Sequence, residues 1–407
     1  MLNAQNGWTD EFLEAMRYVG DPLADDTVAD VFRTGTLQAV NALLTELTRN
    51  DQIPPSGLPP KVYEYLEVTS ELPRLDEAKV ERGENLFMNH GNLALAVLLC
   101  ASLPECYVQK RGVKVLWLTQ RLKEHVFRRL LETCQMVLAV MSKGGLAANG
   151  RGIRAAQKVR LMHAAIRHLI LHQATEGNPA EPPKSFSEVL ERIRWDEKEL
   201  GYPINQQELA YTLLTFSYVI IRGLERMGVE ITPEDKDAFV YCWNVVGRVM
   251  GIREDLLADT YEEAGYIFGR IKKLSAGWSP EGAGLTQSLI QCMEEVIPGH
   301  ALDSLPRHLM WALLGEETAP MLGIRPLNLI ERLEMRAAVN LVRLGTLAKR
   351  EATEDLLLTP VLWHWISNRL LQHLSNLGQP PGWNRSIFQI PAELAESWRV
   401  SETKVAP

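Results

Sequence analysis

Apolar residues recur at every third or fourth position along most of this 407-residue chain, which is the spacing of an amphipathic α-helix. The long runs with this spacing span residues 36–49, 115–141, 153–173, 206–227, 235–250 and 328–348. Segments rich in proline and glycine separate these runs, and alternating strand patterns between tight turns are missing. No period of roughly 20–50 residues repeats, which argues against a solenoid. We therefore expect an all-α fold.

The chain length allows two or three domains of roughly 150 residues, or one large helical domain. We favour one all-α domain over residues 61–375, preceded by a helical extension with a proline-rich linker (1–60) and followed by a tail (376–407). Two helix starts carry capping signals. Thr-Pro-Glu-Asp at 232–235 supplies a cap, a first-turn proline and two acids, and Ser-Phe-Ser-Glu at 185–188 fits a capping box.

The composition limits the kinds of binding partner and the cellular compartment that we expect for this chain. The net charge of −8 argues against a nucleic-acid-binding face, which needs a basic excess. The longest nearly apolar stretch, 93–103, is shorter than the roughly 20 residues of a membrane span, and no secretory signal is visible at the N-terminus. The five cysteines form no CxxC motif, so we expect reduced thiols and a cytoplasmic protein. The oligomeric state stays open.

The most informative segment is 151–173, RGIRAAQKVRLMHAAIRHLILHQ. At 100° per residue His163 falls within an apolar helix face, and the small residues Ala164 and Ala165 beside it are expected to leave room for a large flat group. The apolar members of this face are Val159, Met162, Ile166, Leu169 and Ile170. Basic residues flank the face: Arg154, Lys158, Arg160, Arg167 and His168.

Two interpretations of this helix stay open. His163 is the axial ligand of a haem whose propionates pair with the nearby cations, or it is a core histidine that donates to a backbone carbonyl, with solvated basic flanks. A metal site made of His163, His168 and His172 is excluded on one regular helix. His168 and His172 lie about 40° apart, but His163 lies about 140° from His168.

The preceding helix adds a cation, a carboxylate and a hydroxyl. Arg129 and Thr133 are four residues apart and share a face, with Glu132 beside them. If the loop 142–152 folds this helix onto the next, the three reach the same cavity as His163. A cation and a hydroxyl there polarise bound dioxygen, and a carboxylate serves as a base. The alternative is a surface Arg129–Glu132 pair with Thr133 bonded to its own helix.

Glu105 is a further candidate catalytic carboxylate. It stands in the break Pro-Glu-Cys-Tyr at 104–107, directly after an apolar helix. The alternative is an ordinary helix-end or loop residue.

Five stretches of the sequence resemble a known family: LLCASLPECY (98–107), LWLT (116–119), RRLLETCQMV (128–137), KVRLMHAAIRHL (158–169) and the segment 223–257. Together they are similar to the latex-clearing-protein and mycophenolate-pathway oxygenase (MpaB-like) family, the DUF2236 group. The similar stretches lie within residues 85–260, in the same order along the chain.

The resemblance implies a globin-like helical core with additional helices, haem b as the iron cofactor, and dioxygen-dependent oxidative cleavage of a C=C bond in a hydrophobic, isoprenoid-like substrate. By that likeness His163 is the proximal iron ligand, and Arg129 and Thr133 lie on the distal side. Arg160, Arg167 and Lys158 are the expected cofactor-binding cations. Together with Arg129 and Thr133, Glu132 and Glu105 complete the expected catalytic set.

Two features depart from the family pattern. Glu132 stands where the latex-cleaving members carry a lysine that occupies the distal iron position, so the distal ligand is open. The missing export signal favours an alkene smaller than rubber. The alternative functions are a haem sensor or peroxidase-like protein without C=C cleavage, and a cofactor-free helical binding scaffold.

Overall fold

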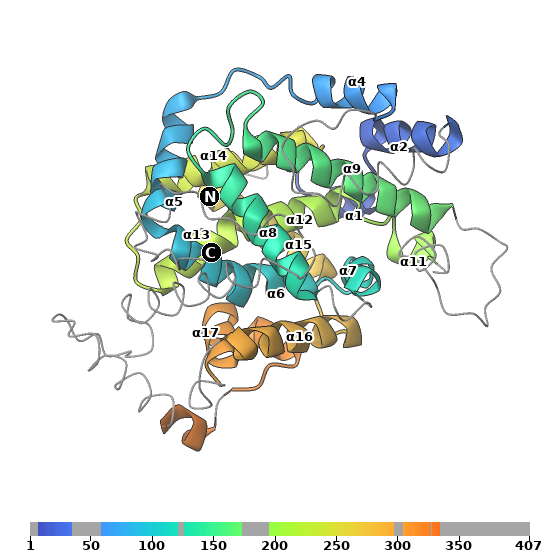
Figure 1. Cartoon of the computed structure of the whole chain (residues 1–407). Coiled ribbons are helices and arrows are strands. Elements are labelled where there is room, and N and C mark those ends of the chain that lie inside the picture. The colour runs from blue at the N-terminus through green and yellow to red at the C-terminus, as the bar shows by residue number, and fades with distance from the viewer. Residues whose placement is uncertain are drawn as a thin grey trace, which may run out of the picture.

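The structure, a computed structural model, describes residues 7–34, 58–120, 126–172, 195–296, 304–326 and 328–333. This described part is all-α, and its β-structure is limited to one isolated antiparallel bridge between Gln109 and Ala276. The helices run through the molecule in Figure 1 as α1 Asp10–Ala15, α2 Pro22–Thr34, α4 Pro60–Val68, α5 Glu77–Val97, α6 Leu103–Tyr107, α7 Val113–Gln120, α8 Val126–Met141, α9 Arg151–Leu171, α11 Glu197–Leu200, α12 Gln206–Phe216, α13 Tyr218–Arg226, α14 Pro233–Val249, α15 Tyr261–Ser275, α16 Pro280–Val296 and α17 Leu305–Thr318. The prediction of an all-α fold is confirmed.

Two of the expected long helices are shorter than their apolar pattern suggested. The run 206–227 is interrupted at Ser217, where the hydroxyl donates to the carbonyl of Leu213 and α13 begins in a new direction. A hydroxyl that bonds back to its own helix bends the chain, and periodicity does not register this. The run 115–141 contains two separate helices, α7 and α8.

The cap predicted before α14 is confirmed, because the hydroxyl of Thr232 accepts from the backbone N–H of Asp235 at 3.2 Å. The capping box at 185–188, the run 36–49 and most of the run 328–348 lie outside the described residues.

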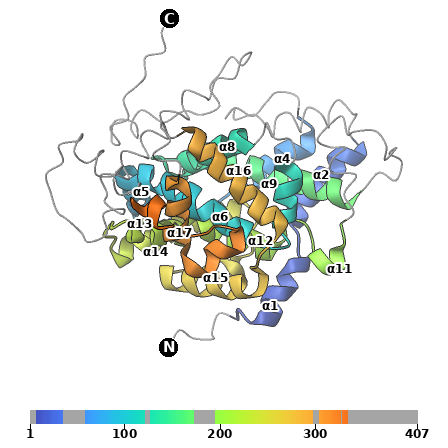
Figure 2. The same ribbon diagram turned by 90° about the horizontal axis from the view of Figure 1, so that it is seen from below.

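α5 is the core helix of the molecule. It continues through a π-helical turn, Leu98–Ser102, into α6, so that 77–107 forms one helical rod. This rod is longer than the apolar stretch 93–103 and has the length and composition of a membrane span. However, 83% of its most apolar window is buried inside the protein, which is the environment of a core helix. In both views of the ribbon α6 lies near the middle of the molecule (Figures 1 and 2).

α2 and α4 pack on one side of α9. Ala164 and Ala165 of α9 are buried against α2 and α4 residues such as Val28 and Tyr65. The expectation that these alanines leave room for a large flat group is therefore wrong, because their small size instead lets α2 and α4 approach α9 closely. Helices of the expected extension 1–60 thus belong to the same packed body, and the boundary at residue 60 stays a prediction.

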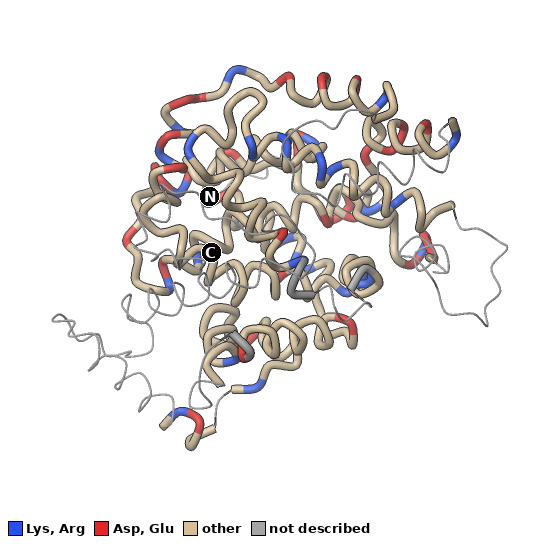
Figure 3. Tube along the Cα trace, viewed as in Figure 1, with Lys and Arg blue, Asp and Glu red and all other residues tan. Residues whose placement is uncertain are grey.

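Figure 3 shows acidic and basic residues mixed along the described helices, with both signs on the same elements.

Candidate active site

The site is built where α8 and α9 pack together. Gly152 at the start of α9 lies so close to α8 that an added Cβ would be 2.6 Å from the Cα of Val140. Backbone bonds within the connecting loop, such as Gly152 N–H to the carbonyl of Gly145 at 3.0 Å, hold the turn tightly. The condition that this loop folds the two helices onto each other is met.

His163 on α9 has a ring nitrogen without a hydrogen-bond partner in the described part of the chain, which is unusual for a buried polar atom. Its Nδ1 atom is buried and has no hydrogen-bond partner among the described residues, while the residue as a whole stays partly exposed. The core-histidine interpretation required a hydrogen bond to a backbone carbonyl, and no such bond is made at Nδ1. Buried polar atoms in native proteins are usually paired, so an unpaired one marks a place where a partner is expected.

The electrostatics of the pocket keep His163 neutral. Burial lowers the pKa of its imidazole to about 3, and the positive charges of Arg167 and Arg129 contribute in the same direction. An imidazole with such a pKa is unprotonated at neutral pH, which is the form that coordinates a metal. Arg129 on α8 therefore lies within electrostatic range of His163, and its place in a shared pocket stays a prediction.

Arg129 is a partly buried cation on α8. Burial lowers its pKa, and nearby Tyr107, Glu132 and Cys106 oppose that shift. Glu132 is also partly buried, so the Arg129–Glu132 pair of the alternative interpretation stays open. Cys106 and Tyr107 belong to α6, and this helix is therefore within electrostatic range of Arg129.

Thr133 is partly buried on α8, one turn after Arg129. Its hydroxyl donates to the carbonyl of Arg129 at 2.9 Å, which is the back-bonded geometry of the alternative interpretation. A hydroxyl in this position still has free lone pairs, and it turns toward another acceptor by rotating about one bond.

Arg160 and Arg167 are buried and form ion pairs with Asp21, which directly precedes α2, and with Asp25 of α2. The guanidinium of Arg160 donates to both oxygens of Asp21, at 2.6 and 2.7 Å, and that of Arg167 donates to Asp25 at 2.8 Å. The expectation of solvated basic flanks is wrong for these two residues. Their assignment to a cofactor stays a prediction, and their hydrogen bonds favour a structural role. Lys158 lies half-buried on the same helix.

His168 and His172 lie away from this arrangement. Their rings stack on each other with centroids 4.2 Å apart, and His168 also contacts Phe32. Their shared face agrees with the 40° separation derived from the helix geometry.

Glu105 lies in a separate buried charge cluster at the other side of α6. Its carboxylate is 0% exposed and accepts from the Nζ of Lys272 at 2.9 and 3.0 Å and from Arg222 at 2.9 Å. Tyr211 donates a further bond at 3.1 Å. The interpretation of Glu105 as an ordinary helix-end residue is therefore wrong. Sequence reasoning missed Lys272 and Tyr211, because 167 and 106 residues separate them from Glu105 and nothing local marks the contact.

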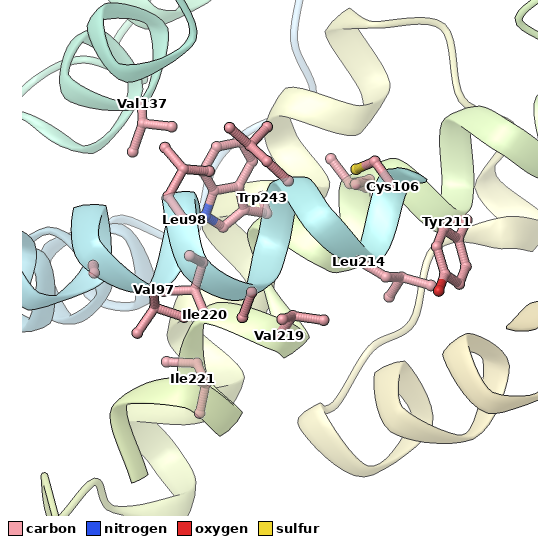
Figure 4. Close-up of a cluster of buried hydrophobic side chains, with 14 of the residues drawn as sticks. Val97, Leu98, Cys106, Val137, Tyr211, Leu214, Val219, Ile220, Ile221 and Trp243 are labelled. Carbon is pink, nitrogen blue, oxygen red and sulfur yellow. The ribbon is translucent and has the colours of Figure 1, made fainter. Parts of the chain in front are cut away.

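A small apolar cavity of about 10 Å³ lies between α5, α8, α12, α13 and α14. Its wall is formed by Phe87, Ala94, Val137, Phe216, Ile220, Phe239 and Trp243. Figure 4 shows part of this region, with Trp243 and Ile220 beside the helix that carries Leu98. Val137 continues the α8 face of Arg129 and Thr133, eight residues or about 12 Å further along the helix. His163 is not part of the wall.

The residues around His163 fit the ligand chemistry of haem b, the cofactor that the family resemblance implies. A neutral imidazole with an uncommitted ring nitrogen is available for iron, and Arg129 places a partly buried positive charge within electrostatic range of it. The cavity is a neighbouring apolar space, not the iron site.

The described part of the chain thus combines an all-α fold with a neutral histidine whose Nδ1 atom is buried and a partly buried arginine. The family described as ER-bound oxygenase mpaB/B′/Rubber oxygenase, catalytic domain, matches residues 90–344, more than half of the chain. The chain belongs to this family, and the predicted resemblance is confirmed.

Two individual proteins support the same conclusion. The rubber oxygenase of Streptomyces sp. (strain K30) is 28% identical over 331 residues, which cover 78% of this chain and 73% of that protein. A solved structure of latex clearing protein in the closed state has a TM-score of 0.66, with 88% of this chain and 90% of that chain covered at 23% identity. That structure shows the likeness of fold.

Proposed function

We propose that this oxygenase binds haem b through His163 and uses dioxygen to cleave a C=C bond of a hydrophobic, isoprenoid-like substrate. The single observation that carries the proposal is His163 itself: its Nδ1 atom is buried and unpartnered among the described residues, its imidazole is neutral, and the charge of Arg129 on the preceding helix acts on it. Family membership supports the oxygenase class. The name of the Streptomyces relative supports a hydrophobic polymer-like substrate class by analogy.

Each residue of the pocket has a defined part in this proposal. Haem, when bound, supplies the iron that binds and activates dioxygen. His163 stays unprotonated across the neutral range, so no proton competes for its lone pair. Arg129 offers a fixed positive charge where negative charge develops on oxygen, and its partial burial strengthens that interaction because less water screens it.

Thr133 is the proton donor and Glu132 the proton acceptor of the proposed site. The Thr133 hydroxyl, now bonded to the Arg129 carbonyl, turns toward oxygen and donates there. The Glu132 carboxylate, an electrostatic neighbour of Arg129, is the group that accepts a proton. The apolar side chains around the small cavity along α8 exclude water, and a hydrocarbon would pack against such a surface once the cavity opens, since in this structure its volume is about that of one water molecule.

The test uses purified protein reconstituted with haemin and incubated with squalene, a short polyisoprenoid, under ¹⁸O₂. The proposal predicts two carbonyl products, each with one ¹⁸O atom, by mass spectrometry. Arg129→Met and His163→Ala should abolish product, and Arg33→Met, at an exposed ion pair with Asp30, should leave it unchanged. Stoichiometric haem without any cleavage of short alkenes would instead support a haem sensor or peroxidase-like protein.

A further inference from the structure

The buried carboxylate of Glu105 leaves no room for a substrate. Its two oxygens together accept bonds from Lys272, Arg222 and Tyr211, and the side chain is 0% exposed. Lys272 is in turn tied to α17, since its Nζ donates to the hydroxyl of Thr318 at 2.6 Å. We name the set of Glu105, Lys272, Arg222, Tyr211 and Thr318 the Glu105 cluster.

The Glu105 cluster anchors α6, and the residues that follow Glu105 on α6 lie within electrostatic range of Arg129 on α8. Cys106 and Tyr107, the two residues after Glu105, are electrostatic neighbours of Arg129. α6 follows directly on the π-helical turn Leu98–Ser102. Such turns shift the register of a helix and are frequent at functional sites, because they re-aim the side chains that follow.

α15 holds α6 at a second place. Past the end of α6, the N–H of Lys110 donates to the carbonyl of Ser275 at 3.2 Å, and the N–H of Gly277 donates to the carbonyl of Val108 at 2.9 Å. Lys272 stands one turn before Ser275 on the same helix. The C-terminal end of α15 therefore fixes both the carboxylate of α6 and the backbone that leaves it.

We propose that Glu105 and Lys272 are positioning residues of the oxygenase site. Their ion pair fixes the rotation of α6, and α6 in turn sets where Cys106 and Tyr107 stand against Arg129. This inference rests on the proposed function for its consequence in catalysis. The rotation of α6 itself is independent of any cofactor and is tested separately.

The chain carries its own reporters for that rotation. Cys106 is buried on α6, where its Sγ lies 3.2 Å from the hydroxyl of Thr215, and burial raises its pKa to about 11. Cys242 is a buried thiol on α14 and Cys100 lies in the π-helical turn. Site-resolved alkylation with iodoacetamide, read by mass spectrometry in haem-free protein, measures the three thiols at once.

In Lys272→Met and Glu105→Gln, the labelling rate of Cys106 should rise at least tenfold while that of Cys242 changes less than twofold. Lys272→Arg keeps a cation and should restore protection. Arg82→Met, which breaks an exposed ion pair between α5 and α14, serves as the matched control with all three thiols protected. Equal deprotection of Cys106 and Cys242, or continued protection of Cys106 in both variants, would overturn the inference.

If Lys272→Met does not fold, Glu105→Gln decides the question, because glutamine has the shape of glutamate and retains acceptor capacity for Lys272. In the haem-loaded enzyme, Glu105→Gln should lower kcat about tenfold with unchanged haem content and KM within twofold. An unchanged kcat in a haem-loaded, active enzyme would remove the catalytic consequence. Absence of haem from the wild-type protein would refute the proposed function and leave the thiol result standing.

Discussion

Arg160 and Asp21 form a two-pronged ion pair across 139 residues of sequence: Nε lies 2.6 Å from Oδ2, and Nη2 lies 2.7 Å from Oδ1. The third guanidinium nitrogen donates to the carbonyl of Val249 at 3.0 Å. Both side chains are buried, so this one contact joins α9 to α14 and to the residue that precedes α2.

Asp21→Asn should therefore lower the free energy of unfolding by about 3–5 kcal/mol, because it leaves the Arg160 charge buried without a counter-charge. Urea unfolding of Asp21→Asn, Arg160→Met and the double variant measures the coupling. A structural pair predicts a double variant less destabilised than the sum of the two single ones. Loss of haem affinity in Arg160→Met at unchanged stability would instead assign Arg160 to the propionates.

Alanine substitutions at Gly251 and Gly228 distinguish the energetic cost of a positive φ from the cost of a steric clash with a neighbouring side chain. Gly251 and Gly228 have φ of +76° and +83°, a conformation that costs about 1–2 kcal/mol for alanine. An added Cβ at Gly251 would lie 2.6 Å from the Cζ of Arg160, whereas at Gly228 it meets nothing within 4 Å. Gly251→Ala should thus destabilise clearly more than Gly228→Ala in thermal unfolding. Equal losses would mean that the Arg160 side chain moves aside freely.

The neutral state of His163 predicts a specific pH dependence in the haem-free protein. The pKa of His163 is about 3 in the folded protein and near 6.5 in an unfolded chain. Below about pH 6.5 the unfolded chain therefore binds a proton at His163 that the folded protein does not bind. Stability from this group is constant above that pH and falls by up to about 1.4 kcal/mol per unit between the two pKa values. His163→Leu lacks the effect. Between about pH 7.5 and about pH 5, the wild type should lose about 2 kcal/mol more than the variant; parallel curves would contradict a buried neutral imidazole.

The helical class and the packing of α8 against α9 followed from the sequence because both depend on local spacing and one short loop. A 3.6-residue period places Arg129, Thr133 and Val137 on one face, and the glycines of the 142–152 loop permit close return of the chain. The partners of Arg160, Arg167 and Glu105 did not follow. Asp21 and Asp25 lie at the start of α2, and Lys272 lies on α15, so all three are far in sequence from the residues they contact. The apolar periodicity of one helix does not indicate which other helix packs against it.

The same limit explains the error at Ala164 and Ala165. Small residues on a helix admit either a ligand or another helix, and local sequence does not distinguish the two. Here α2 and α4 occupy that face. The break at Ser217 has a similar origin, since apolar spacing continues across it while the hydrogen bonding does not.

Thr133 offers a test of the dioxygen side of the pocket. Because its hydroxyl bonds only to its own helix in the structure, Thr133→Val should change the free energy of unfolding by about 1 kcal/mol or less. If the hydroxyl turns to donate to oxygen, turnover should fall about tenfold or more in Thr133→Val and recover largely in Thr133→Ser. Oxygen consumption with squalene measures both. Full activity in the valine variant would exclude a role for the hydroxyl.

The central claim is that His163 holds a haem iron, and the most direct measurement is the absorption spectrum of haemin-reconstituted protein with pyridine haemochrome quantitation, for the wild type and His163→Ala. The account predicts a b-type Soret band at about one haem per chain in the wild type and a large loss of bound haem in the variant, with unfolding of both proteins still cooperative. Stoichiometric haem with an unchanged spectrum in His163→Ala, or no Soret band in the reconstituted wild type, would contradict it.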